Sequence, residues 1–198
     1  MTGDPVVTVA PGVPDGQSDQ AARIYCTALR DKIIPILGPV DRAVAVLAPY
    51  LCLDRIITAR MDGRIAGIAG YKAGGRGVFE PPFSAFRGEY GAIGALVRVT
   101  GLMLLERSEK DGVLLMDGLA VDPGFRGRGL GTRLLEAVLD EARHRKCHSV
   151  RLDVIDTNPR ARSLYERFGF VERRTTRLGI LTALFPFRAA SEMEFVLD

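Results

Sequence analysis

The strongest constraint on this chain is a glycine-rich turn that connects an apolar run to an amphipathic helix. The run Val113–Val121 is predicted to be a strand, and the turn 122–131 leads into a predicted helix at 130–145. The first amides of a helix lack intrahelical acceptors, and the aligned peptide dipoles add roughly half a positive charge there. The turn therefore predicts a phosphate-binding site. Its glycines would let the amides approach an anion and its arginines add charge: Gly127, Gly129, Gly131, Arg126 and Arg128.

Two familiar phosphate-binding loops do not fit this turn. A P-loop needs a Gly-Lys pair followed by Ser or Thr, which the turn lacks. A dinucleotide fingerprint would place its glycines directly after the strand, whereas a charged stretch intervenes here and Thr132 stands where the last glycine belongs. Asp153 lies at the spacing expected for a ribose contact, but the further strand–helix repeats of that fold are missing. A flexible turn with solvated arginines remains the simplest alternative.

A second motif lies downstream of the turn. Residues 158–165 read N-P-R-A-R-S-L-Y, and residues 168–170 read F-G-F. Together with L-A-V-D-P-G-F-R-G-R-G-L-G from Leu119, these segments resemble the two signature elements of the GNAT N-acetyltransferase superfamily. The close resemblance covers residues 113–171. Two motifs at the right separation indicate this family far more strongly than either motif alone.

The resemblance and the hydrophobic periodicity together predict the fold. We expect an α/β (α+β) architecture with a mixed, mostly antiparallel central sheet of about six to seven strands, flanked by helices and splayed at the strand that ends near Val121. The Asp62-Gly63 pair predicts a tight hairpin between two strands. We expect one domain over residues 1–198, with a non-minimal helical insertion at about 74–110. Further strands are expected at 6–10, 56–61, 65–71, 149–154, 171–176 and 192–197, and helices at 19–37, 41–53, 84–106 and 159–168, the first two capped by Asp19 and Asp41.

The resemblance also implies a cofactor and the residues that bind it. The backbone of the strand end should pair with the pantetheine arm of acetyl-CoA, and the turn should wrap its pyrophosphate. A bulge in this strand would open the slot between it and its neighbour. The cofactor-binding residues implied are Leu119, Ala120, Val121, Arg126, Gly127, Arg128, Gly129, Leu130, Gly131, Thr132, Asn158 and Tyr165.

Three of the side chains have a structural role as an alternative to a functional one. Asn158 is implied to touch the cofactor, but it also suits a helix cap before Pro159. Tyr165 is implied to protonate the departing thiolate, although its helical stripe equally suits core packing. Asp117 is the candidate base because similar enzymes often carry a Glu four residues before the valine corresponding to Val121; a satisfied polar residue at a sheet edge is about as probable.

Composition excludes several other classes of protein. A net charge of +3, with basic residues scattered among acids apart from 126–133, argues against a nucleic-acid groove. Cys26, Cys52 and Cys147 are widely spaced and lack a paired His, so neither a disulfide framework nor a metal site is expected. The apolar runs are too short to span a bilayer and residues 1–15 do not resemble a signal peptide, so a cytoplasmic location is expected.

The leading hypothesis is an acyl-CoA-dependent N-acetyltransferase that moves an acetyl group to a primary amine within a ternary complex. The acceptor could be a small molecule or a peptide. A catalytically idle CoA-binding sensor or interaction module on the same fold is the alternative. The 74–110 segment, which carries several aromatic residues and glycines, would serve either as a homodimer surface or as a substrate lid.

Overall fold

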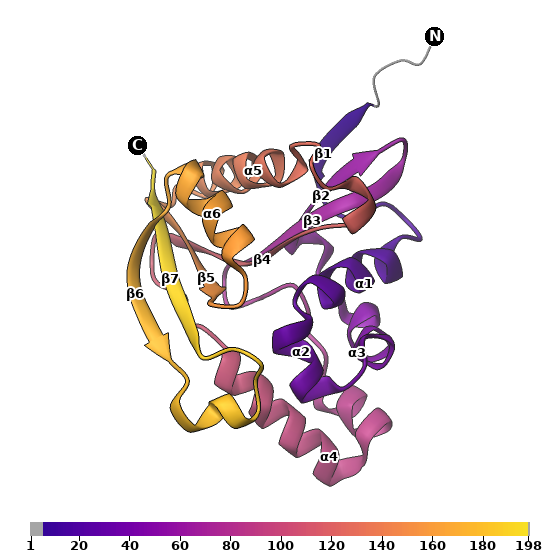
Figure 1. The fold of residues 1–198 in the computed structure, drawn as a ribbon. Coiled ribbons are helices and arrows are strands. Elements are labelled where there is room, and N and C mark those ends of the chain that lie inside the picture. The colour runs from indigo at the N-terminus through magenta and orange to yellow at the C-terminus, as the bar shows by residue number, and fades with distance from the viewer. Residues whose placement is uncertain (1–5, 198) are drawn as a thin grey trace.

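The protein is built on one seven-stranded mixed sheet, seen in a computed structural model that describes residues 6–197 (Figure 1). The strand order is β1-β2-β3-β4-β5-β7-β6, and every pair is antiparallel except β4 with β5. The expected mixed, mostly antiparallel sheet is thereby confirmed. The strands are β1 Val7–Pro11, β2 Ile56–Met61, β3 Arg64–Lys72, β4 Val113–Val121, β5 Ser149–Ile155, β6 Val171–Arg177 and β7 Ala189–Val196.

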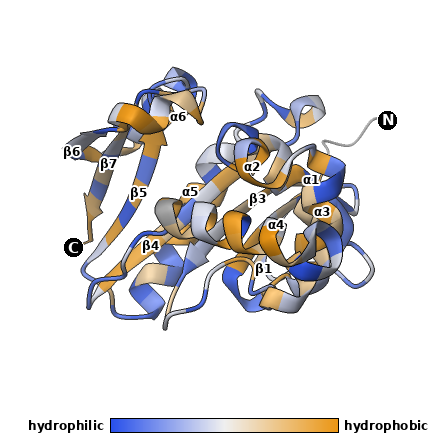
Figure 2. Cartoon of the chain, turned by 90° about the horizontal axis from the view of Figure 1, so that it is seen from below, coloured by the Kyte–Doolittle hydropathy of each residue, from blue (hydrophilic) through white to orange (hydrophobic). Residues whose placement is uncertain are grey.

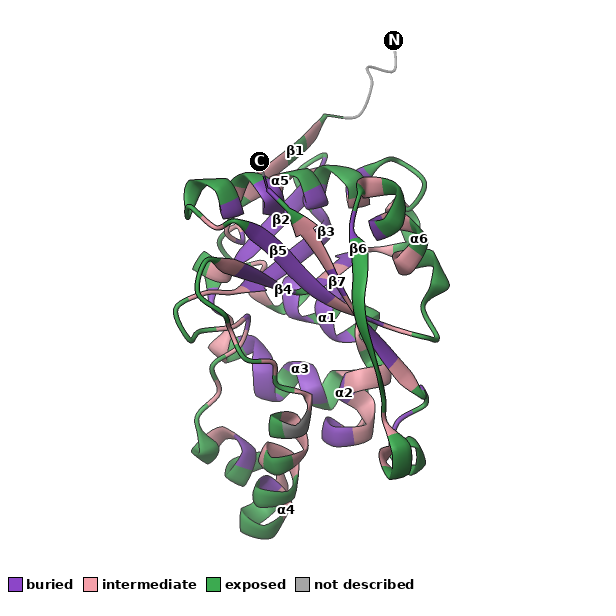
Figure 3. Ribbon diagram, turned by 90° about the vertical axis from the view of Figure 1, so that its left-hand side faces the viewer, coloured by how far each residue is buried: buried purple, intermediate pink, exposed green. Residues whose placement is uncertain are grey.

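Helices cover the two faces of the sheet with separate apolar cores. The first face packs α5 and α6, with Leu134, Leu135 and Val138 at the centre of its core. The second packs α1, α2 and α3, and α4 lies against α2 and α3 beyond the sheet. β6 is exposed along its whole length at one edge (Figure 3). The helices are α1 Ser18–Ala28, α2 Arg30–Leu37, α3 Val40–Leu47, α4 Phe83–Leu105, α5 Leu130–His144 and α6 Pro159–Phe168, with short 3₁₀ helices η1 Ala48–Tyr50, η2 Leu53–Arg55, η3 Pro123–Phe125 and η4 Gly179–Ala183.

The predicted hairpin between β2 and β3 is confirmed. Asp62 and Gly63 both have positive φ, at 51° and 78°, and Met61 pairs directly with Arg64 across the turn. A two-residue turn with positive φ at both positions has the twist that the flanking strands require, which explains the preference for an Asp-Gly pair.

The amino-terminal helices differ from the expected pair. The run expected at 19–37 is two helices, because the chain turns at Leu29, whose φ and ψ of −97° and 20° lie outside the helical region. Neither Asp19 nor Asp41 is a cap: the capping positions are Gln17 and Pro39, and neither makes a side-chain capping bond.

The helix expected at 84–106 is present as α4, but it is interrupted. Gly91 (φ 70°, ψ 175°) interrupts α4, which resets the helical phase. Phe86 before the break is therefore buried, whereas Ile93 and Val97 after it are 82% and 63% exposed. Figure 2 shows that much of α4 is apolar. The loop before α4 is anchored to the protein, because Val78 is only 1% exposed.

Among residues 6–197, no single helix has the length and apolar composition needed to cross a membrane. The helix pair Arg30–Leu37 and Val40–Tyr50, bent by 83°, passes that test of length and composition only as a pair.

The contact between Val78 and β3 gives a stability prediction. A Cβ at Gly70 would lie 2.3 Å from Val78 Cγ2, so Gly70→Ala should lower the free energy of unfolding by about 1–3 kcal/mol through overpacking. Gly77→Ala is the matched control, since nothing lies within 4 Å of its added methyl group. Urea denaturation of both variants measures the difference. Equal stability of the two would show that the loop does not pack on the sheet as described.

Candidate functional site

The site begins where two neighbouring strands separate. β4 and β5 are paired only from Val113–Ser149 to Leu115–Arg151, although both strands continue well beyond. In the pairing of β3 with β4 the register shifts after Gly70, which leaves Asp117 as an extra residue on β4. Such a bulge bends a strand and sharpens its twist. The expected splay is thus confirmed, and beyond Leu115 the backbone of β4 on the side of β5 is left without a strand partner in the described chain.

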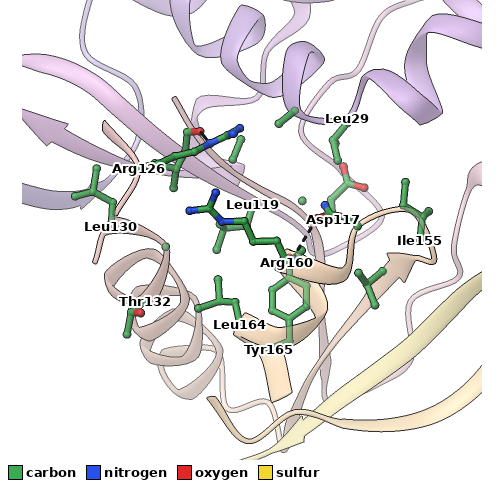
Figure 4. A pocket seen from close by; sticks show the side chains of 18 of the residues that line it. Leu29, Asp117, Leu119, Arg126, Leu130, Thr132, Ile155, Arg160, Leu164 and Tyr165 are labelled. Carbon is green, nitrogen blue, oxygen red and sulfur yellow. Dashed lines mark hydrogen bonds between the residues drawn. The ribbon is translucent and has the colours of Figure 1, made fainter. Parts of the chain in front are cut away.

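A cavity of about 380 Å³ occupies the space between the separated strands (Figure 4). Its wall combines β4, the glycine turn, the first turn of α5, the end of β5 and α6. The structure brings to this one cavity every predicted site residue except Arg128: Asp117, Leu119, Ala120, Val121, Arg126, Gly127, Gly129, Leu130, Gly131, Thr132, Asn158 and Tyr165.

Arg128 points elsewhere than its sequence neighbour Arg126. The guanidinium of Arg128 donates to Met61 Sδ at 3.4 Å and lies 5.9 Å from the ring centroid of Phe125. Arg126 instead donates from Nε to the Val121 carbonyl at 3.3 Å and lines the cavity. Gly127, between the two arginines, and Gly129, after them, both have positive φ (78° and 73°), which other residues rarely adopt.

The glycine turn presents unpaired amides to the cavity. Between Gly127 and Thr132, no backbone amide has an acceptor within residues 6–197, and the first intrahelical bond of α5 is from Arg133 to the Gly129 carbonyl. The turn is tethered at its start, since the Asp122 amide donates to Ala66 and the Asp122 carboxylate accepts from Gly124. A fixed row of free amides at a helix start is a ready site for a phosphate group.

α6 closes the opposite wall of the cavity. The side-chain oxygen of Asn158 accepts from the Ala161 amide at 3.1 Å, so this residue caps the helix and also lines the cavity. α6 packs closely on α5, because a Cβ at Gly131 would lie 3.2 Å from Leu164 Cδ2. Gly131 therefore serves the approach of the two helices rather than an unusual backbone angle.

Tyr165 is both a core residue and part of the cavity wall. It is 6% exposed, and its ring centroid lies 5.8 Å from that of Phe170. Burial raises the pKa of the phenol above its usual value, so the hydroxyl keeps its proton at neutral pH. Within residues 6–197 the hydroxyl makes no hydrogen bond, and Figure 4 shows Tyr165 on the same cavity wall as Arg160 and Leu164.

Asp117 is held by a tyrosine that sequence reasoning did not identify. The Tyr25 hydroxyl, from α1, donates to Asp117 Oδ2 at 2.7 Å. Burial first, and then the Asp117 carboxylate, raise the pKa of Tyr25 well above its usual value, which keeps the phenol a donor. Gly70 and Gly118 pair across β3 and β4, and a Cβ at either would lie 3.3–3.4 Å from Tyr25 Cε2. This glycine pair leaves room for the ring and so positions the hydroxyl.

A second, larger cavity of about 720 Å³ meets the first at Asp117. It lies between α2, α4, the loop before α4 and the segment around η4. Both cavities are lined by the same four residues, Leu29, Lys32, Asp117 and Asp153. We call these four residues the junction. Asp153 is fixed there by Arg107, whose Nε lies 2.5 Å from Asp153 Oδ2.

Lys32 is the most unusual group of the junction. It lies at the start of α2, and no carboxylate oxygen of residues 6–197 is within 4 Å of its ammonium group. The pKa of Lys32 is lowered, chiefly by burial; the carboxylates of Asp117 and Asp153 oppose this effect, and the nearby Arg107 adds to it. No sequence motif includes Lys32, Tyr25 or Arg107. Arg160, a further cation of the cavity wall, falls on a motif position where the family pattern specifies no residue type.

No cluster of three or more His, Cys, Asp or Glu side chains that could hold a metal ion occurs within the described residues.

The Lys32 environment predicts a pH-dependent stability difference. Because the folded-state pKa lies below the unfolded value, the folded state binds fewer protons in the window between the two, and stability rises as pH rises through that window. Lys32→Met should therefore have a larger free energy of unfolding than the parent at pH 7. The difference between the two free energies should become smaller toward pH 10. Urea denaturation across this range, with the exposed Lys110→Met as control, measures it. A gap of constant size, or a less stable Lys32→Met, would contradict the burial of the ammonium group.

The sequence of this chain is similar to those of known proteins. The profile of the acetyltransferase (GNAT) family matches residues 41–170. The chain is 52% identical over 52 residues to the mycothiol acetyltransferase of Beutenbergia cavernae, covering 26% of this chain and 18% of that protein. It is 44% identical over 59 residues to the [ribosomal protein bS18]-alanine N-acetyltransferase of Salmonella typhimurium, covering 30% and 40% respectively. The chain thus matches less than half the length of each of these curated relatives.

Solved structures extend the likeness to the whole fold. Salmonella typhimurium yncA, solved with its cofactor acetyl-CoA, superposes with a TM-score of 0.61 at 16% identity over 97% of this chain and 94% of that one. A splayed mixed sheet, a glycine turn at the start of α5, and a family match over residues 41–170 lead to one conclusion. The chain belongs to the acetyltransferase (GNAT) family.

Proposed function

We propose that this protein is an acetyl-CoA-dependent N-acetyltransferase that transfers the acetyl group directly to a primary amine. The observation that carries the proposal is the row of unpaired amides from Gly127 to Thr132, set beside the free edge of β4 in one cavity. The curated relatives above are named for acetyl transfer, and the structural neighbour holds acetyl-CoA. These likenesses support the same reaction for this chain.

The residues of the cavity fit acetyl-CoA as the donor. The free amides and the guanidinium groups of Arg126 and Arg160 would hold the pyrophosphate, and the β4 edge from Leu119 to Val121 would pair with the pantetheine amides. When bound, the cofactor supplies an activated acetyl thioester. A backbone N–H of the same β4 edge would stabilise the negative charge that develops on the acetyl oxygen, and loss of such a donor typically costs about 3 kcal/mol.

Asp117 suits the role of base. A primary amine with a pKa near 10 is neutral in only about one part in a thousand at pH 7, which costs roughly 4 kcal/mol. The Asp117 carboxylate lies where the two cavities meet, and Tyr25 holds one of its oxygens. The other oxygen is then oriented to take the proton that the amine loses. Asp153 is less suited, because Arg107 already pairs with its carboxylate.

Tyr165 suits the role of hydrogen-bond donor to the leaving sulfur. Its buried phenol retains its proton, so it offers a donor to the departing sulfur. A free thiol has a pKa near 8.5, below that of this phenol, so complete transfer would leave a buried phenolate at a cost. We therefore assign Tyr165 a hydrogen bond to the sulfur as the C–S bond breaks.

The role of the unpaired amides from Gly127 to Thr132 is tested by two isosteric variants. Asn and Asp both tolerate the positive φ of Gly129, so Gly129→Asn and Gly129→Asp should fold alike. Only the carboxylate would repel the pyrophosphate, and we expect acetyl-CoA to bind Gly129→Asp at least tenfold more weakly than Gly129→Asn. Isothermal titration calorimetry at low salt gives both affinities. Equal affinities would place the pyrophosphate away from this helix start.

The role of Tyr165 is tested by removing only its hydroxyl. Tyr165→Phe should lower kcat for amine acetylation by roughly 10- to 100-fold, while the affinity for acetyl-CoA stays within about twofold. Release of free thiol from acetyl-CoA measures the rate. If Tyr165→Phe matches the parent in rate, Tyr165 acts only in packing. If the parent binds acetyl-CoA tightly but releases no thiol with any amine, the protein is instead an idle CoA-binding module.

A further inference from the structure

The larger cavity differs in character from the cofactor cavity. Its inner wall is mainly apolar, and Phe86, Val99, Leu102, Leu178 and Leu181 contribute from α4 and the η4 region. At about 720 Å³ it has the size of a site for a whole small molecule. No strand partner, helix or loop of residues 6–197 fills it. A hydrophobic cavity of this size gains most free energy from a ligand with a large apolar surface.

The charges around this cavity do not favour a polycation. The lining residues include four basic and four acidic side chains, so their formal charges cancel. Two of the acids are already in ion pairs, Glu106 with Lys72 and Asp153 with Arg107, each at 2.5 Å. A polyamine or a lysine-rich peptide would need a surplus of unpaired carboxylates along its length. Of the two junction carboxylates, Asp117 has no cationic partner within 4 Å among residues 6–197.

Part of the lining of the larger cavity is exposed to solvent, at residues that do not line the cofactor cavity. Phe83 and Met103 of α4 are 48% and 64% exposed, and Arg177 at the end of β6 is also exposed. A ligand can therefore enter while the cofactor side is occupied. A long acyl chain on the donor would need no such opening, whereas an acceptor that joins a ternary complex does.

Building on the proposed transferase activity, we infer that the acceptor is a primary amine attached to a bulky or long apolar group. The apolar group occupies the larger cavity between α2, α4 and the η4 region, and the amine reaches the junction beside Asp117. There the nitrogen of the neutral amine bonds to the acetyl carbon, and the C–S bond breaks with its electron pair going to sulfur. Asp117 takes the proton that the nitrogen loses. Coenzyme A leaves as the thiolate, hydrogen-bonded by the Tyr165 hydroxyl, and then takes a proton from water. The 74–110 segment supplies a wall of the acceptor site.

The kcat/KM of acetyl transfer should depend on the length of the apolar chain of the acceptor amine. Along the series butylamine, hexylamine and octylamine, kcat/KM should rise about fourfold for each added methylene until the cavity is filled. 1,8-Diaminooctane, which has the same length but a second charge at its far end, should be a much poorer acceptor than octylamine. Each amine is also titrated calorimetrically into the protein saturated with coenzyme A, which reports binding without turnover.

Variants that fill the cavity complete the test. Leu102→Trp should abolish most of the gain between butylamine and octylamine, while Leu96→Trp, on the same helix but 62% exposed and outside the lining, should keep it. Leu181→Trp, from the opposite wall, repeats the test should Leu102→Trp fail to fold.

The outcomes separate the inference from the activity on which it rests. Transfer to all amines at similar kcat/KM, or a preference for the diamine, would overturn the inference and leave the transferase intact. A preference for longer acyl-CoA donors with no dependence on the amine would also overturn it and assign the cavity to the donor. Chain-length-dependent binding without thiol release would support the apolar-amine site and refute the proposed transfer.

Discussion

The separation of β4 from β5 is the constraint on which the rest of the structure depends. Interior strands of a sheet normally satisfy their amides and carbonyls on both sides, and an unpaired backbone inside a protein is costly unless water or a ligand pairs with it. Here the bulge at Asp117 turns β4 away after Leu115, so an interior strand has an open edge. The same bend places the free amides of the glycine turn along one wall of the gap. An extended ligand with peptide-like groups and a phosphate end complements both features.

The junction links the two halves of the site. Asp117 comes from β4, Asp153 from β5, and Leu29 and Lys32 from the chain around the start of α2, so three segments distant in sequence meet at one point. Two like charges, Lys32 and Arg107, lie close enough to repel one another, and both lie close to the junction carboxylates. The position of Asp117 between the two cavities follows from the bulge, and its orientation follows from Tyr25. Chemistry and substrate selection thus depend on the same local irregularity of one strand.

The sequence predicts the elements whose signals are local. β4, α5 and α6 have nearly the bounds that periodicity and the glycine and proline positions predict, and the β2–β3 hairpin follows from Asp62 and Gly63. The remaining features depend on tertiary contacts. Tyr25 and Asp117 are 92 residues apart, and nothing in the amphipathic pattern of α1 marks its tyrosine as a partner for a carboxylate. Arg126 and Arg128 look equivalent in the turn, yet backbone angles send one into the cavity and the other to Met61.

The helical insertion at about 74–110 also has features that the local sequence does not predict. Its apolar spacing predicted one helix, but the break at Gly91 changes which side chains face the protein. Its contribution to the larger cavity depends on how it packs against α2 and α3, which no local pattern encodes.

Hydrogen exchange, with and without acetyl-CoA, tests the central claim most directly. If the open edge of β4 and the glycine turn bind the cofactor, amides in Leu119 to Val121 and Gly127 to Thr132 will gain protection together, while those of the β1–β2 edge stay unchanged. Binding of acetyl-CoA that leaves both segments unprotected, or protects only a distant surface, would contradict it.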